Sequence, residues 1–200
     1  MVCHPIRICP SHGWLSVFGV RPVSLSRRER TLYDRPGLQP YNMTTDLEIR
    51  RATAADTGAV YEIVLRALRE TNARDYPASV IDRLVLTLPK GVASKLEEWQ
   101  AYVAVVDRQI VGTASLDGST VRAVFVHPDY QGRGIGTNLM DVVENAANLQ
   151  SERTLGVQSS ITAQPFYAKR GFKVVREVFY GEERTIIMSK DISGPSVPSE

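Results

Sequence analysis

The sequence predicts a mixed α/β (α+β) fold, in which one central, mostly antiparallel sheet of about six to seven strands is flanked by helices. Three observations lead to this prediction. Two segments with helical periodicity come first, three strand-like runs separated by turn signals follow, and a strand–helix–strand unit comes after them. Because a strand, a helix and a second strand in succession form a parallel crossover, the sheet is expected to be mixed.

The first elements are a short strand and two amphipathic helices. A strand is expected from Leu47 to Arg51, and Thr53-Ala-Ala-Asp56 is a capping box that starts a helix running to about Glu70. Pro77 opens a second helix, because its missing N–H would have no helical partner there. Each helix has one apolar face, which predicts packing against the sheet. These faces are Val60, Ile63, Val64, Ala67 and Leu68 in the first helix and Val80, Ile81, Leu84, Val85 and Leu88 in the second.

The remaining elements complete the sheet. The first three runs are joined by short polar turns, so they are expected to form an antiparallel meander. A helix with one apolar face begins near Ile135 and forms the crossover to the next strand, and a short helix near Pro165 ends at Gly171. The expected strands are residues 101–106, 110–116, 120–126, 154–157, 172–178 and 184–188.

Three alternating glycines, Gly132, Gly134 and Gly136, stand directly after a strand and directly before an amphipathic helix. Backbone N–H groups at such a helix start can point at one anion, which favours a phosphate site. The loop is neither a dinucleotide fingerprint, because Thr137 stands where a glycine is required, nor a Walker loop, which needs Lys followed by Ser or Thr. An alternative is that the glycines only allow a tight turn.

The wider segment from Val124 to Met140 resembles the acyl-CoA signature of the GNAT (Gcn5-related) N-acetyltransferase superfamily, and the chain is similar to a small bacterial-type member. The family pattern is Gln or Arg, two residues, Gly, one residue, then Gly or Ala, and Gln131, Gly134 and Gly136 match it. The resemblance covers roughly residues 47–192 and implies the GNAT fold, in which a parallel pair of strands splays apart.

The resemblance also implies how acetyl-CoA is held. The backbone amides of the loop would cradle the CoA pyrophosphate, and the helix start would add favourable partial charge. Pantetheine would pair with main-chain atoms of the preceding strand, where an amide near Phe125 would donate to the thioester carbonyl. The implied cofactor-binding residues are Phe125, Val126, Gln131, Gly132, Arg133, Gly134, Ile135, Gly136, Thr137 and Ser160.

A second segment, from Ser160 to Phe172, resembles the other family signature, Asn-x2-Ala-x3-Tyr-x3-Gly-Phe. Tyr167 stands at the position of the tyrosine that donates a proton to the departing CoA thiolate, and a phenol with a pKa of about 10 stays protonated for that role. Ser160 replaces the Asn of many members and can still donate one hydrogen bond. A core tyrosine is the alternative interpretation of Tyr167.

The predicted function is transfer of the acetyl group from acetyl-CoA to a primary amine, a small molecule, by direct attack in a ternary complex. The alternatives are a protein or peptide N-acetyltransferase and a non-catalytic acyl-CoA-binding or interaction module. A general base is needed, and Asp117, His127 and Glu177 are all open candidates.

Composition indicates which binding partners and which cellular location to expect. Beyond residue 42 the chain has 18 basic and 20 acidic residues, so no broad basic face for nucleic acid is expected. The longest apolar runs are strand-sized, which predicts no membrane span. The two cysteines give no disulfide framework, which favours a cytoplasmic location. No metal is expected, because the Cys and His residues near the start lack paired ligand spacing. A homodimer is an open alternative.

Residues 1–46 and 193–200 are expected to lie outside the folded domain of residues 47–192. The first segment holds six Arg, two acids and five prolines within residues 1–42, and it is expected to be either disordered or a misassigned start, with Met43 as the alternative start. The last segment is rich in Pro and Ser and is expected to be a disordered tail.

Overall fold

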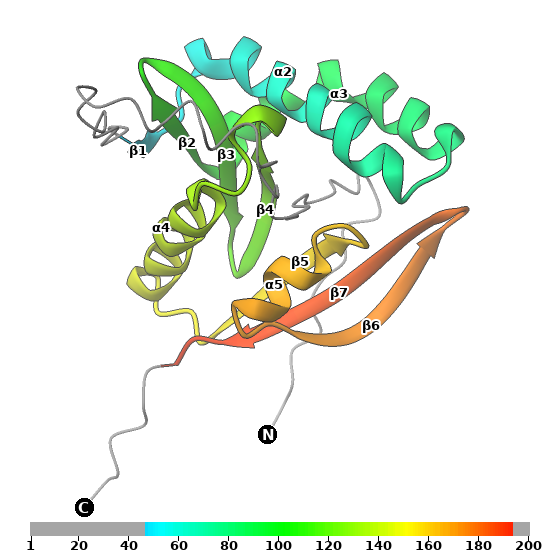
Figure 1. Ribbon diagram of the computed structural model, residues 1–200. Coiled ribbons are helices and arrows are strands. Elements are labelled where there is room, and N and C mark those ends of the chain that lie inside the picture. Colours follow the sequence, from blue (N-terminus) through cyan, green and yellow to red (C-terminus); the bar gives the residue numbers. More distant parts are fainter. Residues whose placement is uncertain (1–46, 194–200) are drawn as a thin grey trace, which may run out of the picture.

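The computed structural model describes residues 47–193, and the expectations for residues 1–46 and 194–200 lie outside these described residues (Figure 1). One seven-stranded sheet has the order β1-β2-β3-β4-β5-β7-β6, and every neighbouring pair is antiparallel except β4 and β5. This confirms the predicted fold class. The strands are β1 (Glu48–Arg51), β2 (Gln100–Val106), β3 (Gln109–Asp117), β4 (Thr120–Val126), β5 (Thr154–Ser160), β6 (Lys173–Tyr180) and β7 (Glu183–Asp191).

Helices cover both faces of the sheet (Figure 1). The α-helices are α2 (Thr57–Arg66), α3 (Ala78–Glu98), α4 (Ile135–Leu149) and α5 (Gln164–Lys169). Strand side chains alternate between the faces, so Val103 and Phe125 pack with α2 and α3, whereas Ala104 and Val124 pack with α4 and α5. No helix within residues 47–193 is long and apolar enough to cross a membrane.

The parallel pair separates soon after it begins. Only Thr120 with Gly156 and Val121 with Val157 are paired between β4 and β5. Just beyond, Ala123 adopts a φ of 46°, and the register between β3 and β4 shifts there, which marks a β-bulge. The last residues of β4 therefore pair with β3 alone, and the edge of β4 that faces β5 carries no ladder among the described residues.

The first helix changes its geometry before its predicted end at Glu70. The α-helical part ends at Arg66, and a π-helical turn, η2 (Ala67–Thr71), and a 3-10 turn, η3 (Asn72–Arg74), follow it. A π-turn inserts one extra residue per turn, which redirects the side chains beyond it. The helical segment predicted to reach about Glu70 is present, but its last turn is π-helical, because apolar spacing gives no sign of a change from i–4 to i–5 hydrogen bonding. The second helix is longer than its predicted apolar face and ends at Glu98.

The predicted capping box at the start of α2 is present and is reinforced from β1. A short 3-10 turn, η1 (Ala54–Asp56), precedes α2, and the Thr53 amide donates to Oδ2 of Asp56 at 2.7 Å. The Arg50 guanidinium donates to both carboxylate oxygens of Asp56 at 2.8 Å. These hydrogen bonds, Arg50 first, hold the pKa of Asp56 well below its usual range. Asp56 thus joins the first strand to the first helix.

Replacing Asp56 by asparagine is expected to lower the free energy of unfolding by about 2 kcal/mol at pH 7, because a bidentate charged pair is lost from a nearly buried site. A lowered folded pKa stabilises the fold fully above the ordinary value of about 4, and this stabilisation is lost as pH falls below it. The difference between wild type and variant should therefore shrink in acid. Urea unfolding at pH 7, 4 and 3 measures it, with the exposed Asp82→Asn as control. A difference that does not change with pH would contradict this assignment.

Candidate functional site

The glycine loop joins the end of β4 to the start of α4. A short 3-10 turn, η4 (Pro128–Tyr130), leads into the loop, and α4 begins directly after Gly134. Gly132 and Gly134 adopt φ values of 76° and 79°, which lie in the left-handed region that favours glycine. The backbone path therefore requires two of the three glycines, as a tight turn would, and this path leads directly into the start of α4.

The first amides of α4 donate no hydrogen bond within the helix. The backbone N–H of Asn138 donates to the Gly134 carbonyl at 3.0 Å. The amides of Ile135, Gly136 and Thr137 come before this bond in the chain. A helix leaves its first amides without internal partners, and its dipole places partial positive charge at the same point. The arrangement suits phosphate oxygens.

A glycine in β3 allows α4 to lie close to the sheet. A Cβ at Gly112 would come within 3.0 Å of the Leu139 side chain, 3.2 Å of Ile135 and 3.2 Å of the Phe125 carbonyl oxygen. Any larger residue would push the start of α4, and with it the loop, away from β4. The sequence analysis did not include Gly112, although an isolated glycine inside a strand is a known sign of close approach.

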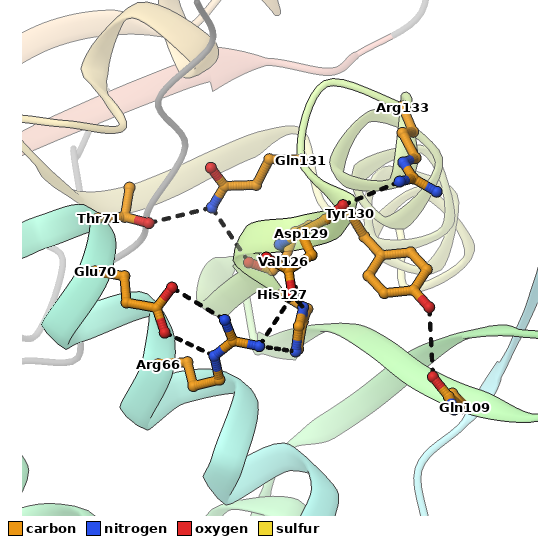
Figure 2. A network of polar contacts seen from close by, with 10 residues as sticks. All are labelled: Arg66, Glu70, Thr71, Gln109, Val126, His127, Asp129, Tyr130, Gln131 and Arg133. Atoms are coloured by element: carbon orange, nitrogen blue, oxygen red, sulfur yellow. Dashed lines mark hydrogen bonds and ion pairs between the residues drawn. The ribbon is translucent and has the colours of Figure 1, made fainter.

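The Gln131 side chain ties the loop to two other elements (Figure 2). Its Nε2 donates to the Val126 carbonyl at 3.3 Å and to Oγ1 of Thr71 at 3.4 Å. Thr71 is the last residue of the π-turn η2, so this turn lies beside the loop. Gln131 therefore acts on the loop through its side chain, in addition to the predicted role of its amide.

A second set of contacts holds the turn before the loop (Figure 2). Arg66 binds Glu70 at 2.7 Å, lies 2.6 Å from Nε2 of His127 and donates to Asp129 at 3.2 Å. Burial, and then the charge of Arg66, lower the pKa of His127. His127 is thus a hydrogen-bond partner of Arg66. His127 was one of the open candidates for the general base. Its contact with Arg66 could not be predicted from the sequence, because Arg66 lies 61 residues from His127 and 63 from Asp129.

Arg133 folds back onto the loop. Its guanidinium lies 4.9 Å from the centre of the Tyr130 ring, and Nη2 donates to the Asp129 carbonyl at 3.1 Å. The Tyr130 hydroxyl in turn donates to Gln109 at 3.4 Å (Figure 2). Arg133 stacks on an aromatic face and adds positive charge beside the helix start.

The two predicted strand residues lie where β4 leaves β5. Val126 pairs with Gly112 and Phe125 pairs with Thr113, both on the β3 side. Both side chains are buried, Phe125 toward α2 and α3 and Val126 toward α4. The structure therefore brings these residues and the loop to one edge of the opening between β4 and β5.

The second predicted signature forms the other side of this opening. Ser160 ends β5, and its Oγ accepts a hydrogen bond from the Ala163 amide at 3.1 Å at the start of α5. Tyr167 lies on α5, fully buried, with the rings of Phe166 and Phe172 edge-on at 5.2 and 5.5 Å. This burial fits a core tyrosine and a proton donor in an enclosed site equally well.

The other two base candidates lie elsewhere. Asp117 stands at the β3–β4 turn 3.5 Å from Arg122, and Glu177 on β6 forms a two-point pair with Arg184 at 2.6 and 2.9 Å. Both carboxylates are exposed. Within residues 47–193 no group of three His, Cys, Asp or Glu side chains is placed to hold a metal ion.

Sequence comparison agrees with this geometry. The model of the acetyltransferase (GNAT) domain family matches residues 85–188, just over half of the chain. The chain belongs to the GNAT acetyltransferase family, and it is an acetyl-CoA-dependent acyltransferase.

Individual relatives show how far the likeness extends. The uncharacterized N-acetyltransferase YafP of Escherichia coli is 29% identical over 132 residues, which are 66% of this chain and 85% of YafP. The peptidyl-lysine N-acetyltransferase YjaB of Salmonella typhimurium is 41% identical over 89 residues, 44% of this chain and 59% of YjaB. A GCN5-related N-acetyltransferase from Rhodopseudomonas palustris is similar in structure, with a TM-score of 0.69, 26% identity, and coverage of 72% of this chain and 94% of that one.

Proposed function

We propose that the chain transfers the acetyl group of acetyl-CoA to a primary amine of a small molecule, by direct attack of the amine in a ternary complex. The observation that carries the proposal is the early end of the β4–β5 ladder. It leaves the last residues of β4 and the start of α4 on one side, and β5 with α5, the helix of Tyr167, on the other. A catalyst of this reaction has to hold a phosphate-bearing donor at one point and deliver a proton at another.

The residues present suit the donor. The amides from Gln131 to Thr137 would hold the pyrophosphate, because Gly132 and Gly134 allow the left-handed turns that expose them. The edge of β4 at Phe125 and Val126, which has no strand on the β5 side among the described residues, would hydrogen-bond to the amide groups of pantetheine. Ser160, at the end of β5, would lie on the opposite side of the donor, and Arg133 would add a positive charge near the phosphates.

Acetyl-CoA supplies the acetyl thioester, and the protein's own groups manage charge and protons. A β4 amide near Phe125 would donate to the carbonyl oxygen, on which negative charge grows as the amine nitrogen bonds to carbon. The carbon–sulfur bond then breaks, and the Tyr167 hydroxyl would give its proton to the sulfur. Exclusion of bulk water around Tyr167 keeps that proton available for the transfer. The proton that the amine nitrogen loses as the amide forms would return to the Tyr167 oxygen through water.

A peptide lysine is the second candidate acceptor. YjaB acts on peptidyl-lysine, and its likeness to this chain extends over less than two thirds of its length. A lysine side chain and a small alkylamine present the same ammonium group, so the same acetyl-transfer chemistry would serve both.

The test is to incubate the purified chain with acetyl-CoA and a panel of small amines and lysine peptides, and to follow the release of free thiol. We expect thiol release that depends on the acceptor, with small amines preferred over peptides. A reaction without acceptor gives the background rate of hydrolysis. Tight CoA binding with no acceptor-dependent release would contradict the proposal and favour a non-catalytic acyl-CoA-binding module.

A further inference from the structure

The hairpin between β6 and β7 reaches the connection between α2 and α3 (Figure 1). The Tyr76 hydroxyl donates to the Arg184 carbonyl at 2.6 Å and accepts from the Ile161 amide at 3.0 Å. In the first two turns of α3, Ser79 donates a hydrogen bond to Glu182 and Arg83 donates one to Glu183, each at 2.7 Å. The start of α3 is thereby fixed to the hairpin and to the end of β5.

Glu183 differs from the other carboxylates of this contact because it is buried. It is 2% exposed, and its Oε2 binds Arg83, whereas its Oε1 has no hydrogen-bond partner among residues 47–193. Burial raises the pKa of Glu183, and the nearby charge of Arg83 opposes this effect. Arg83 is itself half-exposed, so only one mobile side chain separates the carboxylate from solvent on that side.

Strand register places Glu183 beside the proposed transfer site. Thr185 lies directly opposite Ser160 in the β5–β7 ladder, so their side chains share one face of the sheet. Glu183 precedes Thr185 by two residues and therefore lies on that face too. Ser160 accepts a hydrogen bond from the amide of Ala163, the residue before α5, and it ends β5. Glu183 therefore lies within two residue positions of the strand end where acetyl transfer is proposed.

The polar atoms in this region are suited to a cation. Oγ1 of Thr185 has no hydrogen-bond partner among residues 47–193, yet the hydroxyl lies near enough to Glu183 to oppose the rise in its pKa. Asn72, fully buried in the connection between α2 and α3, has neither its amide oxygen nor its amide nitrogen hydrogen-bonded among the described residues. A protonated primary amine carries three N–H donors and no acceptor, so buried oxygens of this kind match it. An unpaired buried carboxylate oxygen is otherwise costly.

We propose that Glu183 binds the ammonium group of the acceptor, which makes the acceptor of this enzyme a cationic alkylamine. The inference rests on the proposed function and names the substrate class of that same site. Arg83 pairs with the carboxylate in the absence of the acceptor and competes with the ammonium for it, so Arg83 would move aside toward solvent when the ammonium arrives.

The test compares Glu183→Gln with Glu182→Gln, which removes the adjacent exposed carboxylate. Acceptors are an alkylamine, charged at pH 7, and an arylamine, neutral at that pH. We expect Glu183→Gln to raise the KM for the alkylamine at least about tenfold, because one charged hydrogen bond is lost. The KM for the arylamine and the Kd for acetyl-CoA should change less than about twofold. Glu182→Gln should match the wild type.

A second variant, Arg83→Gln, separates recognition from structure, because it breaks the same ion pair and keeps the carboxylate. We expect an unchanged or lower KM for the alkylamine. A rise that matches Glu183→Gln, or equal effects on charged and neutral acceptors, would overturn the inference, as would a wild type that acetylates only arylamines. A wild type that acetylates no amine would instead overturn the proposed function.

Discussion

Replacing Tyr167 by phenylalanine is expected to lower the turnover number about 100-fold or more and to change the Kd for acetyl-CoA less than about twofold. The change removes one oxygen atom and leaves the ring between Phe166 and Phe172, so the packing of α5 should remain. Without the phenol the thiolate would have to leave unprotonated, which slows the breaking of the carbon–sulfur bond. Steady-state kinetics and calorimetric titration with CoA measure the two quantities.

The matched control is Tyr61→Phe on α2, which removes a phenolic hydroxyl on the side of the sheet covered by α2 and α3. It should leave turnover unchanged. If Tyr167→Phe instead unfolded the protein while Tyr61→Phe did not, Tyr167 would be a core residue and not a proton donor. Circular dichroism of both variants distinguishes these outcomes.

Replacing Gly134 by aspartate is expected to raise the Kd for CoA about 100-fold or more, which corresponds to about 2.7 kcal/mol. The new side chain would place a carboxylate beside the pyrophosphate at the start of α4, where like charges repel. A residue other than glycine also strains the left-handed backbone at φ 79°.

Gly118→Asp separates these two effects. Gly118 also has a left-handed φ, 56°, and a Cβ there would meet nothing within 4 Å, but it lies in the β3–β4 turn and not in the loop. Its variant should show similar backbone strain and normal CoA affinity. Equal weakening by both variants, or an unchanged Kd for Gly134→Asp, would show that the pyrophosphate lies elsewhere.

Local sequence patterns predicted most of the fold, because each element carries its own periodicity. Val103 and Ala104 point to opposite faces of the sheet, which follows from strand geometry, and the capping box at Thr53 depends on residues three apart. The family resemblance, and not the periodicity, implied that the parallel strands splay. The single departure in the helices, the π-turn Ala67–Thr71, has no local signature of this kind.

The polar contacts of the site were less predictable than its glycines. Gly132 and Gly134 carry their conformational requirement in their own chemistry, whereas Arg66 and His127, or Arg83 and Glu183, are ordinary charged and polar residues until the fold brings them together. Glu183 was not among the expected base candidates for this reason. Burial, which distinguishes it from Glu177 and Glu182, is a property of the packed hairpin and not of the sequence around it.

The short stretch from Arg66 to Tyr76 lies between the regions proposed for the two substrates. Its beginning contacts the turn before the glycine loop through Arg66 and the loop residue Gln131 through Thr71, and its end contacts the hairpin through Tyr76. One segment of eleven residues therefore supports both the proposed donor side and the proposed acceptor side, so a substitution in it is expected to affect the binding of both substrates.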